Sequence, residues 1–104
     1  VVPTRYGRHG LLFTSQGTLS LRNAAWARDD SPPDPECNCP ACRHHSRGYL
    51  RHLIKIGEAL GPRLAALHNL TYYLNLLRRA RIAIENGEFE ALHREIEEIS
   101  EIRI

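Results

Sequence analysis

Three cysteines lie within six positions of this 104-residue chain, in the pattern C-x-C-x2-C from Cys37 to Cys42. An odd number of thiols this close together is a poor framework for disulfides. Three soft thiolates in one short loop can instead wrap a metal ion, and a reducing cytoplasm keeps them available for it. The pattern therefore predicts a metal site, against the simpler alternative of three buried free cysteines.

Zinc suits this donor set better than an iron–sulfur cluster, because a cluster ordinarily takes a fourth thiolate and the chain has only three cysteines. A histidine must then complete the site. His44 and His45 are close to the thiols, but they would tie the loop to nothing distant. His68, 26 residues after Cys42, would tie it to a helix. Spacing alone leaves these candidates open. Four protein ligands would leave the single zinc ion no open position, so it would be structural.

The remaining pattern predicts a mostly α-helical fold with one short β-hairpin. Residues 10–14 read as a short strand, residues 15–17 as a turn, and residues 18–21 alternate polar and apolar side chains with period two. Residues 23–36 form a connector, because their three prolines exclude a helix interior. Helical periodicity then predicts three helices, from Ser46 to a break at Gly61-Pro62, from there to Asn86-Gly87, and from Phe89 to Ile99.

The long second helix carries the most regular apolar face, formed by Leu64, Leu67, Leu70, Leu74 and Leu77. Three helices and a hairpin bury limited surface, so a domain of this size is marginal without a staple or a partner. Zinc would be that staple, since its binding free energy becomes folding free energy.

Charge and hydropathy exclude some classes of protein. A net charge of +2 is too small to mark a nucleic-acid-binding protein by itself. No run of eighteen apolar residues could span a membrane, and the first residues do not read as a secretory leader, so we expect a cytoplasmic protein. The chain contains no Met and opens on Val1-Val2, as though a strand had been cut. We therefore expect a piece of a longer protein, against the alternative of chance trimming.

The chain resembles the C-terminal part of bacterial tRNA-guanine transglycosylases, in one register over about residues 1–95. The likeness begins with Pro3-Thr4-Arg5, Arg8, Gly10 and Leu12-Phe13-Thr14, continues through Leu21-Arg22-Asn23-Ala24, Ser31-Pro32 and Asp34, and ends with Ser46-Arg47, Tyr49-Leu50, Gly57-Glu58, Leu60-Gly61, His68-Asn69-Leu70 and Tyr73. The spacing C-x-C-x2-C-x25-H is similar to the zinc signature of that family. The resemblance implies His68 as the fourth ligand.

That resemblance implies a (β/α)8 TIM barrel with a zinc-binding subdomain near its C-terminal end, here accompanied by the last elements of the barrel. It implies an enzyme that exchanges the wobble guanine of certain tRNAs for a 7-deazaguanine precursor of queuosine, through an aspartate nucleophile. It also implies a homodimer with the zinc region near the subunit contact. Tyr49 and His52, on one helix edge beside the metal loop, are candidates for that contact. The alternative for both is ordinary packing.

The chain departs from the family in lacking most of the barrel. The nucleophilic aspartate would precede Val1, and Asp29, Asp30 and Asp34 match no catalytic position, so we assign no catalytic residue and expect this chain alone to be inactive. Arg5 and Arg8 match arginines near the tRNA anticodon loop, which implies a phosphate or base contact. The alternative for both is a solvated loop.

The expected organisation has three parts. Residues 1–22 would hold the end of a barrel strand, an Arg-rich loop and the hairpin, residues 23–70 the zinc-binding subdomain, and residues 71–104 helices that pack on the absent barrel. Two other hypotheses remain: an autonomous zinc module that binds RNA or protein without catalysis, and an interaction fragment that binds only its own barrel. An enzyme fragment should leave a large apolar face unpaired on the long helix, whereas an autonomous module should not.

Overall fold

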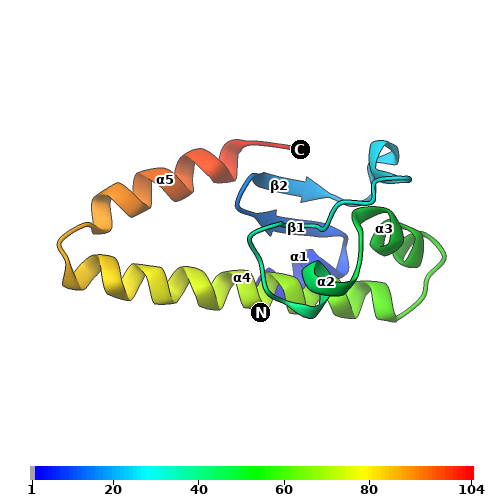
Figure 1. Cartoon of the computed structure of the whole chain (residues 1–104), viewed down its shortest axis with the longest axis horizontal. Coiled ribbons are helices and arrows are strands. Elements are labelled where there is room, and N and C mark those ends of the chain that lie inside the picture. Colours follow the sequence, from blue (N-terminus) through cyan, green and yellow to red (C-terminus); the bar gives the residue numbers. More distant parts are fainter. Residues whose placement is uncertain (1) are drawn as a thin grey trace.

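The computed structural model describes residues 2–104, with side chains from Arg5 onward. One long helix, α4, runs the length of the molecule, and the other elements lie along it (Figure 1). In chain order the elements are α1 (Val2–Arg8), β1 (Leu11–Thr14), β2 (Gly17–Ser20), the 3₁₀ helix η1 (Ala24–Trp26), α2 (Pro40–His44), α3 (Arg47–Lys55), α4 (Leu60–Glu85) and α5 (Phe89–Glu101).

The β-hairpin lies at the centre of the fold. Its strands β1 and β2 pair antiparallel around the turn at Ser15-Gln16, with Leu12 opposite Leu19 and Phe13 opposite Thr18. The far edge of β2 is covered by the end of the chain, because Thr18 N–H donates to Ile102 O (2.8 Å) and Ile104 N–H donates to Thr18 O (2.9 Å). The hairpin predicted from alternation is therefore confirmed, with both strands one residue from their expected bounds.

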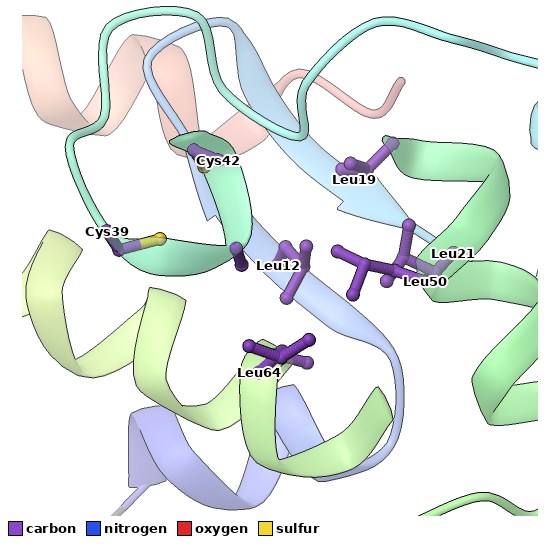
Figure 2. Close-up of a cluster of buried hydrophobic side chains, with 9 residues drawn as sticks. Leu12, Leu19, Leu21, Cys39, Cys42, Leu50 and Leu64 are labelled. Carbon is purple, nitrogen blue, oxygen red and sulfur yellow. The ribbon is translucent and has the colours of Figure 1, made fainter. Parts of the chain in front are cut away.

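A small apolar core forms where the hairpin meets α3 and α4. Leu12 and Leu19 of the hairpin and Leu50 of α3 are fully buried, and Leu64 and Ala65 of α4 complete the cluster. Figure 2 shows Leu12 at the centre, with Cys39 and Cys42 on one side and Leu21 and Leu50 on the other. The core is thus continuous with the cysteine loop. Its described part contains only six buried leucines, which are Leu12, Leu19, Leu21, Leu50, Leu53 and Leu64.

The start of the chain differs from the expected strand end and Arg-rich loop. Residues 2–8 form helix α1, which packs on α4, while Val1 lies outside the described residues. A Cβ on Gly7 would lie 2.7 Å from Ala65 O and 2.8 Å from Ala66 Cα. The absent side chain of Gly7 therefore lets the two helices approach closely, a tertiary effect that local sequence does not reveal.

The helices after the cysteines match the predicted order but not every boundary. Helix α3 begins at the Ser46 cap, as expected, but ends near Gly57 instead of Gly61. Gly57 adopts φ +78°, the left-handed conformation that commonly follows a helix C-terminus. Helix α4 then starts at Leu60, so Pro62 lies within its first turn, where a missing N–H costs nothing. Helix α5 ends at Glu101, close to its predicted end.

The predicted apolar face of α4 is largely exposed. Leu67, Leu70, Leu74 and Leu77 keep 39–51% of their surface accessible, and only Leu64 of the predicted face is buried. The residues that α4 does bury are Gly61, Leu64, Ala65, His68 and Asn69. The polar pair His68 and Asn69 thus faces the hairpin, and the unpaired apolar face expected of an enzyme fragment is present.

Candidate metal centre

The cysteine loop is shaped by a short helix that begins between the second and third thiols. Cys39 is the N-terminal cap residue of α2, and Pro40 occupies the first helical position, where its fixed φ suits the helix. Cys42 lies in the same turn and faces inward. The Cys39 N–H also donates to Cys37 Sγ at 3.4 Å, which folds the loop back on its first thiol.

Helix α4 supplies the imidazole. His68 is fully buried, and its Nε2 lies 2.8 Å from Phe13 O. A carbonyl oxygen can only accept, so Nε2 carries the proton and donates it. The other ring nitrogen, Nδ1, faces the thiols, 3.4 Å from Cys39 Sγ and 3.2 Å from Cys42 Sγ. The hairpin therefore fixes both the ring orientation and the tautomer that leaves Nδ1 for a metal.

The four predicted ligands come together in space. One ligand atom each from Cys37, Cys39, Cys42 and His68 lies within 4.8 Å of the others. Tetrahedral ligands about 2.3 Å from a zinc ion would be about 3.8 Å apart, so a small contraction would close the site. Cys39, Cys42 and His68 are buried and Cys37 is half-buried. The structure thus provides a closed Cys3His group that could hold one metal ion.

The electrostatics of the metal-free cluster show why a cation fits it. A hydrogen bond with Cys42 lowers the pKa of the Cys39 thiol, while the same bond, burial and the neighbouring thiolate raise the pKa of Cys42. One thiol ionises readily and the second resists. Burial alone would lower the pKa of His68, but hydrogen bonds with Cys37 and Cys39 raise it to about 10. A bound divalent cation would replace these protons and remove the repulsion between thiolates.

A buried carboxylate outside the ligand set holds the loop against the hairpin turn. Asp34 is 2% exposed, and its side chain accepts from Ser15 N–H (2.8 Å), Ser15 Oγ (2.7 Å) and Glu36 N–H (3.0 Å). Its backbone carbonyl accepts from Cys37 N–H at 3.1 Å. Asp34 therefore positions the first thiol relative to β1.

Arg47 fastens the connector that precedes the thiols. Its guanidinium donates to Pro33 O (3.2 Å) and Gln16 Oε1 (3.3 Å) and stacks 4.7 Å over the Trp26 ring. Its backbone N–H donates to Ser31 O. Contacts at Asp29, Ser31 and Pro33 therefore hold the proline-rich segment 29–35 along its length and not only beside the thiols.

Sequence reasoning assigned no role to Asp34, Arg47 or Asn69. Asn69 stands beside His68 and binds the same strand, since it accepts from Phe13 N–H (3.0 Å) and donates to Leu11 O (2.8 Å). All three residues lie within stretches that carry the family resemblance. The resemblance could therefore have marked these three positions. It does not reveal which groups their side chains contact.

The other candidate residues lie away from the cluster. His44 is exposed at the end of α2, and the His45 ring stacks on Tyr49 with 5.1 Å between centroids. Neither belongs to the group of four ligands. Arg5 and Arg8 are exposed on α1, in a helix and not in the expected loop. Within the described residues, no helix combines the length and hydropathy needed to cross a bilayer.

Comparison with known proteins agrees with this geometry. The family model described as queuine tRNA-ribosyltransferase matches residues 1–101. The chain is similar to proteins of that name from Nitrosomonas europaea (54% identity over 94 residues, 90% of this chain and 25% of the relative) and Thiobacillus denitrificans (53% over 89 residues, 86% and 24%). It spans about a quarter of the length of these curated relatives. The match over nearly the whole chain, at more than half identity, places this protein in the queuine tRNA-ribosyltransferase family.

Proposed function

We propose that this chain is the C-terminal, zinc-braced part of an enzyme that exchanges the wobble guanine of tRNA for a 7-deazaguanine. The observation that carries the proposal is the Cys3His group, in a chain that matches its family over residues 1–101. The relatives are about four times longer than the matched region. The chain would therefore act as one piece of a glycosyltransferase of queuosine biosynthesis.

Zinc is the metal that fits this group. Three thiolates and one imidazole are a common structural zinc set, and four protein ligands leave no position for water or substrate. The ion would supply no chemistry to the reaction. It would fasten the loop at Cys37–Cys42 to His68 and, through the His68–Phe13 hydrogen bond, to the hairpin. This brace would compensate for the small apolar core.

The nucleophile would come from the rest of the enzyme. Asp34, the most buried aspartate, is occupied by Ser15 and Glu36. Asp29 accepts hydrogen bonds from Ser31, and Asp30 is exposed in the connector. Asp34 lines a hollow with Glu36 and Glu95, but hydrogen bonds from Ser15 and from Glu36 N–H already occupy its carboxylate. Asp30 lines a hollow that holds no second carboxylate. We therefore propose that the isolated chain is inactive.

The exposed leucines of α4 would be covered by the barrel. Leu67, Leu70, Leu74 and Leu77 recur at spacings of three and four residues, so they lie on one face of the helix. Exposed apolar faces of this kind mark surfaces that pack on a partner. The remaining three quarters of a relative would supply a partner of that kind, the (β/α)8 barrel implied by the resemblance.

The proposed partners follow from the family. Arg5 and Arg8, exposed near the end of α1, would contact the tRNA anticodon loop, and this is consistent with their charge and accessibility. The parent would be a cytoplasmic homodimer. Tyr49 and His52, both on α3, are candidates for its subunit contact.

A chimera tests the proposal directly. The C-terminal quarter of the Nitrosomonas europaea enzyme is replaced by this chain, and incorporation of labelled guanine into tRNA is measured. We expect exchange by the chimera, and its loss when Cys39 and Cys42 are both replaced by Ala. His44→Ala, the matched control outside the ligand group, should retain exchange. A chimera that folds and binds zinc but does not exchange guanine would instead favour an autonomous zinc module.

A further inference from the structure

A hollow with charged side chains at its margin lies apart from the metal centre, where β2 ends beside α3. It has a volume of about 140 Å³ and is lined by Leu21, Arg22, Arg51, Ile54 and Lys55. Three of its five lining residues are cationic and none is acidic. We propose that Arg22, Arg51 and Lys55 form a binding site for a backbone phosphate of RNA.

Both arginines are held in place by the backbone. Arg22 Nε donates to His9 O at 2.9 Å, and Arg51 Nε donates to Asn23 O at 3.2 Å. Each of these bonds uses Nε and leaves the terminal NH2 groups of the guanidinium fork for a ligand. A planar fork fixed at Nε suits a phosphate, which takes two parallel N–H···O bonds.

The floor of the hollow is part of the fold. Leu21 is fully buried in the core, and Ile54 is packed against that core. Gly10, at φ +85°, passes beside them, and a Cβ there would lie 3.6 Å from both Arg22 Cγ and Ile54 Cδ1. A left-handed glycine therefore brings the backbone of residues 9–10 up to Arg22 and lets His9 O hold its guanidinium.

The charge around the hollow is not neutralised locally. The two ion pairs among the described residues, Arg79–Glu95 and His93–Glu97, lie on α4 and α5. Neither residues 1–28 nor residues 37–57 contain an Asp or Glu. A concave site with one sign of charge concentrates the opposite charge, so an anion is the expected ligand.

RNA is the source of phosphate that the surroundings favour. Arg22 donates to His9 O, one residue after Arg8, so the hollow lies beside the end of the helix that carries the arginines proposed to meet tRNA. The choice of RNA as the source of the phosphate rests on the proposed function. The hollow itself is defined by side chains other than Arg5 and Arg8.

The test uses the full zinc-loaded chain and an anticodon stem–loop RNA, with affinity measured against KCl concentration. The variant Arg22→Gln/Arg51→Gln/Lys55→Gln should bind about fourfold more weakly near physiological salt for each phosphate that it no longer neutralises, and its salt slope should fall by about 0.7 per phosphate. The control Arg78→Gln/Arg81→Gln/Arg94→Gln removes the same charge from α4 and α5 and should change neither quantity. Equal weakening by both variants, or no weakening by the first, would overturn the site.

Two further measurements complete the design. Lys55→Gln removes no hydrogen bond or ion pair of the described structure, so its effect on affinity cannot come from a loosened fold. AMP is titrated in parallel, and binding of AMP as tight as that of RNA would assign the hollow to a small phosphate ligand and contradict the proposal. If the chimera is inactive but the first variant weakens RNA binding, the proposed enzyme function is refuted and this site is supported. If the chimera is active but the first variant leaves RNA binding unchanged, the enzyme function is supported and this site is refuted.

Discussion

The carboxylate of Asp34 accepts two hydrogen bonds from Ser15, one from the backbone N–H at 2.8 Å and one from the hydroxyl at 2.7 Å. Ser15 lies at the hairpin turn, and Asp34 lies three residues before the first thiol. This pair therefore fixes the distance between the strand that orients His68 and the loop that carries the cysteines.

Replacing Asp34 should weaken both the fold and the metal site. Asp34→Ala leaves three donors without their acceptor, and we expect a loss of ~3 kcal/mol in the free energy of unfolding. Zinc affinity should fall about tenfold or more, as for other residues that support metal ligands. Urea titration and competition with a chromophoric chelator measure the two effects. Asp30→Ala, at an exposed neighbouring position, should change neither.

Removal of the metal should make stability fall at alkaline pH. The pKa of His68 in the metal-free protein is raised to about 10, so its contribution is complete below pH 6.5 and is lost as pH rises through 10. The lowered pKa of Cys39, about 4, acts in the opposite direction and offsets the His68 effect up to about pH 9. The raised pKa of Cys42 adds to the loss of stability above pH 9. Urea titrations of chelator-treated protein should therefore show little change between pH 6.5 and 8 and a decline from pH 9 to pH 10. In the zinc-loaded protein His68 should make no such contribution. A metal bound at Nδ1 keeps the imidazole neutral, so its protonation no longer changes with pH in this range. An equal decline with and without zinc would argue against metal binding at His68.

Adding a methyl group at Gly7 should detach α1 from α4. The new Cβ would meet backbone atoms of Ala65 and Ala66, which cannot move without shifting the helix. We expect Gly7→Ala to cost about 1–3 kcal/mol, despite the better helix propensity of alanine. Amide hydrogen exchange in α1 would locate the change. Arg8→Ala, exposed in the same helix, should stay within about 0.5 kcal/mol of the parent protein.

The exposed face of α4 should respond to mutation only in the longer protein. Leu74 is 51% exposed, so Leu74→Gln should change the unfolding free energy of this chain by less than about 0.5 kcal/mol. In the chimera the same change should cost about 2 kcal/mol or more, because the side chain would be buried there. Thermal melts of both proteins provide the measurement. Ile84→Gln, at the more exposed end of α4, offers a control for helix effects. A chimera indifferent to Leu74→Gln would contradict the proposed covering of this face.

The sequence alone was sufficient where a local pattern dictates the structure. Alternation predicted the hairpin, and thiol spacing predicted the loop at Cys37–Cys42. The fourth ligand could not be chosen from spacing, because the distance in sequence between Cys42 and His68 does not reveal their separation in space. The resemblance selected His68, and the structure brings it to the thiols.

Periodicity misidentified the buried face of α4 for a physical reason. It finds the most apolar face, but in this chain the hairpin selects the face that carries His68 and Asn69, because their side chains satisfy backbone groups of β1. The leucine face that periodicity detected is exposed, and we propose that a partner outside this chain covers it. Helix α1 was missed because its stability comes from the close approach of Gly7 to α4 and not from its own residues.

The hairpin has neither strand edge open in the described structure. Side chains from α4 occupy the backbone groups of β1, and residues 102–104 run along β2. An uncovered strand is a template on which another molecule can add its own strand, the first step of many aggregates. His68, which faces the thiols, therefore also covers the edge of β1 against self-association. Removal of a metal bound at this site would loosen His68, and we expect this to expose an edge that recruits further copies of the chain.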